Sequence, residues 1–411
     1  MLILNAILAN LFITLPSTTN KPKILLLSAY DAKSHQFWRK SLVKGLSCFD
    51  WTEIALADRY FSWRVRGNSL TFAYQYQELL NQPYDCLLAT SMVDLSALRG
   101  FVPQLAKIPN ILYFHENQFA YPIDENSDRA SMNAINAQLT SIYSMLCADL
   151  LLFNSHYNRQ TFIRGVKHLL KKLPDGVPKD LINGVSEKIR ILPVPISKKI
   201  SKQSPLMFKT AINEFEIIWN HRWEYDKQPE IFFDALKIVK AKGYTFKLHV
   251  LGQSFRQKPS CFEKAKEYFI DDILTWGYQS AEKYESILSQ ATLVISSANH
   301  DFQGLSMLQA IEQGCIPIAP NRLAYPEYID PQYLYSVDGK INEALSLANK
   351  LIEIMDEFKT NLHSQYAGNN VDAKMALINL IKPYYQQTLL PKYKELIEQQ
   401  IDSFNQSSNG N

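Results

Sequence analysis

The residues that indicate chemistry most directly are two cations, Arg222 and Lys227, in the segment NHRWEYDKQPE. They stand five positions apart, and they follow a short segment, Glu216–Trp219, whose apolar residues are typical of a buried strand. Arginine offers a planar fork of donors and lysine a point charge, so the two together could neutralise a diphosphate. A solvated basic loop has the same composition, and the spacing alone leaves both interpretations open.

A second polar loop separates the apolar run Leu293–Ser296 from an amphipathic stretch that starts at Leu305. Gly304 stands at the predicted helix start, where unpaired backbone N–H groups and the helix dipole favour an anion. Asp301 lies in the loop, and Gln309 lies a turn and a half into the helix. Open α/β sheets bind ligands at such loops. An ordinary βαβ unit with a capped helix would give the same pattern.

Two clusters of polar side chains also follow apolar runs in the first half of the chain. They comprise Lys33, Ser34 and His35 in the first cluster and His115, Glu116 and Asn117 in the second. The first cluster stands at a helix start that could bind an anion, although a capped helix explains it equally well. The second places an imidazole, a carboxylate and an amide directly after a buried strand, which indicates a site more strongly than a lone histidine does.

An arginine-rich segment, RYFSWRVRGNSLTFAYQY, runs from Arg59 to Tyr76. Its arginines interleave with Tyr60, Phe61 and Trp63. Guanidinium forks and aromatic faces are how proteins hold phosphates and the unpaired bases of single-stranded RNA. A partly buried amphipathic loop would have the same composition.

The elements that must position these residues are short apolar strands that alternate with amphipathic helices, a pattern typical of parallel sheets. In the first half the predicted strands are Ile24–Ser28, Trp51–Leu56, Tyr84–Ser91, Ile111–Phe114, Leu150–Phe153 and Lys188–Val194. In the second half they are Glu216–Trp219, Phe246–Leu251, Ile273–Gly277, Leu293–Ser296 and Cys315–Ala319. We therefore predict an α/β fold with two Rossmann-like, doubly wound domains that face each other across a cleft.

The domain boundaries follow from shifts in composition. We predict an apolar extension over residues 1–22, a first domain over 23–197, a polar linker over 198–213, a second domain over 214–335, a helical region over 336–402 and a disordered tail over 403–411. A long helix, Lys382–Ile401, is expected to pack back across both domains. The apolar stretch Met1–Asn20 has no basic residue ahead of it, so we interpret it as an extension rather than as a signal peptide or membrane anchor.

Composition narrows the class of function. The 411 residues carry 43 Lys+Arg and 40 Asp+Glu, a net charge of +3, so RNA contact would have to be a local patch. Five scattered cysteines without a CxxC pair are typical of a reduced, cytoplasmic protein. Eight histidines form no HxxxH pair, and we expect neither a metal nor another cofactor, and no stable membrane association.

Together these segments resemble a known family. The order Arg222, Lys227, Gly277-Tyr278, Asp301-x-x-Gly304 and Gln309 resembles the retaining GT-B glycosyltransferases of family 4, with Asp301 and Gln309 where that family has two glutamates. The segments FSWRVRGNSL, LYFHENQFAYP, FNSHYNRQTF and HRWEYDK resemble the tRNA-queuosine α-mannosyltransferase family, in its order, over about Lys23 to Leu334. That family implies GDP-mannose as the donor and the queuosine of tRNA-Asp as the acceptor.

The resemblance also implies a role for each candidate residue. Arg222 and Lys227 would neutralise the diphosphate, together with backbone N–H groups near Phe302, Gly304 and Leu305. Asp301 would hold mannose hydroxyls, and Gln309 would hold the ribose. Gly277 and Tyr278 would flank the base. His115 would contact the sugar or assist at the reacting centre. Lys33, Ser34, His35, Glu116 and Asn117 would line the acceptor side, and Arg64, Arg66 and Asn68 would contact the anticodon loop.

Two other functions are compatible with the sequence. One is a family 4 glycosyltransferase that acts on a lipid or polysaccharide, which an anchoring Met1–Asn20 would favour. The other is a non-catalytic nucleotide-sugar or tRNA binding protein, which the replacement of two glutamates by Asp301 and Gln309 would favour.

Overall fold

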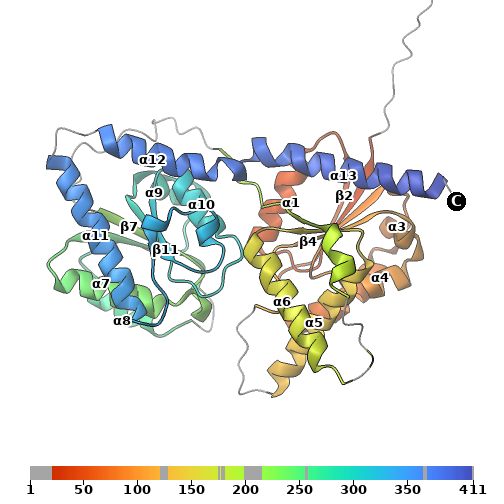
Figure 1. Ribbon diagram of the computed structural model, residues 1–411, viewed down its shortest axis with the longest axis horizontal. Helices are drawn as coiled ribbons and strands as arrows, with labels where there is room; N and C mark the ends of the chain where they lie inside the picture. Colours follow the sequence, from red (N-terminus) through yellow and green to blue (C-terminus); the bar gives the residue numbers. More distant parts are fainter. Residues whose placement is uncertain are drawn as a thin grey trace, which may run out of the picture.

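The computed structural model describes residues 21–120, 128–174, 176, 181–198, 215–254, 258–363 and 368–409. These residues form two six-stranded sheets in which the strands pair in parallel. Figure 1 shows the two sheets in separate halves of the molecule, each with helices packed around it. The predicted fold class, two doubly wound α/β domains, is therefore confirmed.

The first sheet has the strand order β2-β1-β3-β4-β5-β6. Its strands are β1 (Lys23–Ser28), β2 (Asp50–Ala55), β3 (Cys86–Thr90), β4 (Asn110–Phe114), β5 (Leu150–Phe153) and β6 (Ile189–Ile191). Leu25 and Leu27 of β1 pack into one core cluster, while Ile24 and Leu26 pack into another on the opposite face. Both faces of the sheet are covered, which explains why the strands read as continuous apolar runs.

The α-helices that the described residues of the first domain form are α1 (Lys33–Gly45), α2 (Phe61–Gln75), α3 (Gln77–Leu80), α4 (Leu95–Phe101), α5 (Asp128–Cys147) and α6 (His156–Lys172). Helices α2, α4 and α5 pack against one another on one face. On the other face, α1 contributes Trp38 and Leu42 to the core.

The second sheet has the order β12-β11-β10-β7-β8-β9, which is the Rossmann order read from the other end. Its strands are β7 (Phe215–Asn220), β8 (Phe246–Leu251), β9 (Ile273–Gly277), β10 (Leu293–Ile295), β11 (Ile316–Pro320) and β12 (Leu334–Tyr335). Its helices are α7 (Pro229–Ala241), α8 (Cys261–Tyr268), α9 (Ala281–Gln290), α10 (Leu305–Glu312) and α11 (Glu343–His363).

Two last helices carry the chain back to the first domain, as predicted. Helix α12 (Gly368–Ile381) contacts α10, and α13 (Gln386–Asn409) contacts α1 and β3. Figure 1 shows them in blue, α12 over the second domain and α13 over the first. Tyr393 of α13 anchors this return, because its hydroxyl accepts a hydrogen bond from the indole N–H of Trp38 at 3.0 Å.

Each predicted strand is present. Leu150–Phe153, Phe246–Leu251 and Ile273–Gly277 have the predicted ends, and the other strands differ by one to three residues. Three expectations need correction. The arginine-rich segment forms helix α2 rather than a loop. Residues 403–409, predicted to be a disordered tail, continue helix α13. Strand β12 was not predicted, and its two residues pair with the end of β11. The proposed extension at 1–20 and linker residues 199–213 lie outside the described residues.

Candidate functional site

The candidate residues gather at the topological switch points of the two sheets. In the first sheet the winding reverses between β1 and β3, and in the second between β7 and β10. Ligands of doubly wound proteins bind beyond the carboxyl ends of the strands at such points. The loop after β1 leads into Lys33 and His35, the loop after β7 carries Arg222 and the loop after β10 carries Asp301.

Contacts between the domains bring these loops together. The ammonium of Lys33, at the start of α1, lies 4.2 Å from the centre of the Tyr278 ring, which follows β9 in the second domain. Tyr157 of α6 packs against Phe302 with ring centres 5.9 Å apart. Leu305 packs against core residues of both domains. The strand ends of the two domains therefore face one another.

Lys227 lies in a short 3₁₀ turn just before α7 and is almost fully buried. Its ammonium forms an ion pair with Asp226 at 2.9 Å and donates a hydrogen bond to the His300 carbonyl at 2.5 Å. The carboxylate of Asp226 also lies 3.4 Å from Nδ1 of His300. Although Asp226 is largely buried, its hydrogen bonds to His300 and Lys227 hold its pKa well below the usual range. Lys227 is thus a fixed cation at the site.

Arg222 is placed differently from Lys227. Its side chain is 52% exposed and forms an ion pair with Glu224 at 3.0 Å. Burial raises the pKa of Glu224, and the adjacent guanidinium opposes that rise. Burial raises the pKa of Tyr30 and lowers that of His35; the charge of Arg222 opposes the first shift and adds to the second, so it acts on the first domain as well. The structure therefore brings one exposed and one buried cation to the same loop.

Asp301 folds back onto its own loop. One carboxylate oxygen accepts hydrogen bonds from the backbone N–H groups of Gln303 at 3.3 Å and Gly304 at 2.8 Å, and the other accepts one from the Tyr325 hydroxyl at 3.3 Å. Two of the N–H groups near the start of α10 are thus already occupied by a carboxylate. The sequence predicted that an anion binds at this helix start. The anion found there is the carboxylate of Asp301, the residue that the family resemblance assigned to the sugar.

Gly304 has a positive φ of 75° at the start of α10. A Cβ there would collide with the Tyr328 hydroxyl and approach the Tyr325 ring. Only glycine fits this backbone and this close approach. Gln309 is half-buried on α10, and Phe302 is buried where the loop meets the first domain.

Two histidines from different elements of the first domain stack on each other. The rings of His35, in α1, and His115, after β4, lie 4.1 Å apart and nearly parallel. Burial lowers the pKa of His35, and burial together with His35 lowers that of His115 well below its usual value. Both imidazoles are therefore neutral at pH 7. Nε2 of His115 is buried and has no hydrogen-bond partner within the described part of the chain, so it can serve a ligand.

The other acceptor-side candidates divide into accessible and structural residues. Lys33 and Ser34 are exposed and Glu116 is half-buried. Asn117 is fully buried: its amide nitrogen donates to Asn158, and its oxygen accepts from the N–H groups of Phe119 and Ala120. Because both ends of this amide are occupied, the prediction that Asn117 contacts the acceptor is wrong.

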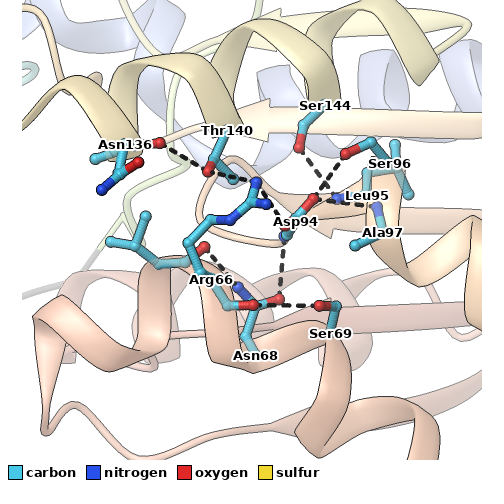
Figure 2. A network of polar contacts seen from close by, with 12 residues as sticks. Arg66, Asn68, Ser69, Asp94, Leu95, Ser96, Ala97, Asn136, Thr140 and Ser144 are labelled. Carbon is cyan, nitrogen blue, oxygen red and sulfur yellow. Dashed lines mark hydrogen bonds and ion pairs between the residues drawn. The ribbon is translucent and has the colours of Figure 1, made fainter. Parts of the chain in front are cut away.

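Of the residues predicted to contact RNA, Asn68 is also structural. Figure 2 shows its amide between α2 and the segment that leads into α4. It donates to the carbonyl of Met92 at 3.0 Å and accepts from the N–H of Asp94 at 3.0 Å, and it is fully buried. Arg66 is 55% exposed and forms an ion pair with the buried Asp94 at 3.3 Å. Arg64 is half-buried.

Two residues that link the domains were not singled out by the sequence. The carboxylate of Glu327 accepts hydrogen bonds from the N–H groups of His156 and Tyr157 at 3.0 and 2.7 Å, at the start of α6. Gln303 forms two hydrogen bonds with the backbone of Val194. Gln303 stands between Asp301 and Gly304, but a loop glutamine has no sequence signature that would reveal a partner 109 residues away.

The described residues form neither a metal site nor a membrane span. Across these ranges no three His, Cys, Asp or Glu side chains lie close enough together to hold a metal ion. None of the helices in the same ranges combines the length and the apolar character that a membrane span requires.

The arrangement matches solved glycosyltransferases over nearly the whole chain. The structure of Anabaena Alr3699/HepE with UDP-glucose aligns with a TM-score of 0.63 at 13% identity and covers 92% of this chain and 99% of that one. A glycosyltransferase from Rickettsia africae ESF-5 aligns with a TM-score of 0.61 at 14% identity, over 93% and 99%. The fold is therefore that of a GT-B glycosyltransferase.

Sequence comparison identifies the family. The family model described as tRNA-queuosine alpha-mannosyltransferase N-terminal matches residues 23–196, and that described as glycosyl transferases group 1 matches residues 203–370. The tRNA-queuosine alpha-mannosyltransferase of Drosophila melanogaster is 30% identical over 387 residues, 93% of this chain and 98% of that protein. The chain belongs to the tRNA-queuosine alpha-mannosyltransferase family and is a hexosyltransferase, which confirms the resemblance.

Proposed function

We propose that this enzyme transfers mannose from GDP-mannose to the queuosine of tRNA-Asp with retention of anomeric configuration. The observation that carries the proposal is the 30% identity to the Drosophila melanogaster protein named tRNA-queuosine alpha-mannosyltransferase, of which 98% is covered. The pairing of an exposed with a buried cation at the second switch point supports a nucleotide-sugar donor.

The donor would lie against the second domain. Arg222, half-exposed and on a short loop, can turn its guanidinium to a diphosphate in place of Glu224. Lys227 would add a fixed positive charge from its buried position. Gln309 would accept hydrogen bonds from the ribose hydroxyls, and Gly277 and Tyr278 would flank the base. We propose no metal, because these two cations supply the charge that would neutralise the leaving diphosphate.

At the reacting centre, the bond between the sugar and the diphosphate breaks as the acceptor hydroxyl bonds to the same face of the sugar. The hydroxyl proton passes to the departing phosphate oxygen, so no covalent enzyme intermediate is needed. The neutral His115 would contact the sugar through Nε2. Asp301, whose carboxylate retains lone pairs, would accept a hydrogen bond from a sugar hydroxyl while it also binds the backbone N–H of Gly304. Closely facing domains would hold the reactants and exclude water.

The acceptor would approach from the first domain, past Lys33, Ser34 and Glu116. A tRNA acceptor, together with five cysteines that form no disulfide among the described residues, supports a cytoplasmic location. Arg64 and Arg66 would meet the RNA beyond the acceptor nucleoside.

The decisive experiment is incubation with GDP-mannose and queuosine-containing tRNA-Asp, followed by mass analysis of the nucleosides. We expect the queuosine to gain one hexose, and tRNA without queuosine to gain none. Release of mannose to water, or transfer to a lipid or polysaccharide but not to the tRNA, would contradict the proposed acceptor. UDP-glucose serves as the donor control, and equal transfer from it would contradict the proposed donor.

A further inference from the structure

An aromatic stripe runs along the outer face of α2 and includes Tyr60, the residue just before the helix. Tyr60, Trp63 and Tyr74 are 68%, 57% and 72% exposed, and the half-exposed Leu70 continues the same face. Spacings of three and four residues from Trp63 to Arg66, Leu70 and Tyr74 follow one side of the helix. The inner side of α2, with Val65 and Phe72, packs into the core.

Trp63 lies flat on the helix. A Cβ at Gly67 would collide with three carbon atoms of the indole, so the ring rests directly against the backbone there. One face of the indole is covered by Gly67, and more than half of the residue's surface remains exposed. A ring fixed in this way offers its other face as a rigid surface for stacking, and little conformational freedom is lost when a ligand binds.

The charge around this stripe is positive. The guanidinium of Arg59 lies 5.4 Å from the centre of the Tyr60 ring. Neither Arg59 nor Arg64 has an acidic partner among the residues that the structure describes. Arg66 is held in place by Asp94, as Figure 2 shows, and still keeps 55% of its side chain exposed. Arginines beside exposed rings suit phosphates that alternate with bases.

The stripe starts beside the candidate site. Phe61, at the first turn of α2, packs against Tyr30 with ring centres 5.7 Å apart. Tyr30 in turn is close enough to Glu116 and Arg222 for both charges to act on its hydroxyl. From there α2 extends 15 residues, or about 22 Å, which is long enough to follow several nucleotides.

We infer that Trp63, with Tyr60 and Tyr74, is a stacking platform for unpaired bases of the RNA acceptor next to the nucleoside that enters the site. This inference rests on the proposed function and adds a surface to it. Stacking accepts any base, so the platform would hold the loop while the reacting nucleoside supplies the specificity. The aromatic faces would contribute affinity that depends little on salt, and the arginines affinity that falls with salt.

The test measures binding of an RNA hairpin that has the acceptor loop sequence with guanosine at the modified position. Trp63→Ala should weaken this binding about tenfold, and Trp63→Phe should recover most of it. Tyr268→Ala, which removes an exposed ring from α8 in the second domain, is the matched control and should change nothing. In the wild type, hairpin binding should quench tryptophan fluorescence, and Trp63→Ala should lose that quenching.

Two further readouts separate stacking from other roles. Trp63→Ala should leave the dependence of binding on salt unchanged, whereas Arg64→Ala should reduce it. Trp63→Ala should also raise the KM for tRNA and leave the KM for the donor unchanged. Equal weakening of a fully paired RNA duplex would overturn the platform, and so would a Trp63-dependent self-association or Trp63-dependent binding to anionic phospholipid vesicles.

Failure of the platform and failure of the proposed function give different results. If the wild type adds hexose to queuosine tRNA but Trp63→Ala binds the hairpin as the wild type does, only the platform is wrong. If the wild type neither adds hexose to the tRNA nor binds the hairpin, the proposed acceptor is wrong, and the platform falls with it.

Discussion

The side-chain amide of Gln303 forms two hydrogen bonds with the backbone of Val194, across the boundary between the domains. Its oxygen accepts from the Val194 N–H at 2.8 Å, and its nitrogen donates to the Val194 carbonyl at 2.9 Å. Both residues are almost fully buried. Because Gln303 stands between Asp301 and Gly304, the position of the first domain is coupled directly to the loop at the second switch point.

Replacement of Gln303 by alanine should therefore weaken both the fold and donor binding. It would leave a buried N–H and a buried carbonyl of Val194 without partners, which should lower the free energy of unfolding by about 2 kcal/mol. The KM for the donor should rise because the loop loses this support. Denaturant unfolding and initial-rate kinetics measure the two effects. The exposed Gln290 provides the control, and equal effects of Gln290→Ala and Gln303→Ala would contradict the assignment.

The two cations should respond differently to alanine substitution. Arg222→Ala should abolish most transfer with little loss of stability, because the arginine side chain is half exposed. Lys227→Ala should abolish transfer and also lower the free energy of unfolding by roughly 2–3 kcal/mol, because it leaves the buried carboxylate of Asp226 without its ammonium. Thermal unfolding beside the hexose-transfer assay separates these outcomes. Wild-type turnover in both variants would exclude the diphosphate role.

Much of the fold was readable because its strands are buried on both faces. Continuous apolar runs such as Ile24–Ser28 are typical of parallel sheets that are covered on both faces. Ligands of such sheets bind beyond the carboxyl ends of the strands, so the sequence also predicts where the donor and acceptor site lies. Asn68 and Asn117 show where this reasoning stops. An amide that closes a buried backbone network and one that contacts a ligand have the same residue type, and only the packing around them, contributed by distant segments, separates the two. The pairing of Gln303 with Val194 was hidden for the same reason.

A substitution at Gln309 tests the donor site by strengthening a proposed hydrogen bond to the ribose rather than by removing one. Gln309 is half-buried on α10, at the position that the resemblance to the retaining GT-B glycosyltransferases of family 4 matches with a glutamate. Gln309→Glu should leave turnover intact and make the KM for GDP-mannose unchanged or up to about fivefold lower, since a hydrogen bond to a charged acceptor is ~1 kcal/mol stronger than one to a neutral acceptor. Gln309→Ala is the matched control and should raise that KM. A collapse of activity in Gln309→Glu would mean that the ribose contact is wrong.

Buried neutral histidines should make the protein sensitive to mild acid. Burial, reinforced by the nearby Lys227, lowers the pKa of His221 from 6.5 to about 4. In the unfolded chain this imidazole takes up a proton as the pH falls through 6.5, whereas in the folded chain it stays neutral until about pH 4. The stabilisation is therefore complete above pH 6.5 and is lost between these two values, by ~3 kcal/mol for a shift of this size. The lowered pKa values of His35 and His115 act in the same direction.

Unfolding in denaturant at about pH 7.5 and about pH 5 should show this loss as a falling free energy of unfolding. His221→Gln removes one titrating group, so about one proton fewer should be taken up on unfolding at the lower pH. The imidazole of His221 in the folded protein should titrate near pH 4 by NMR. A titration midpoint near 6.5 would show that His221 is reached by water, and the pH dependence would then have to come from other groups.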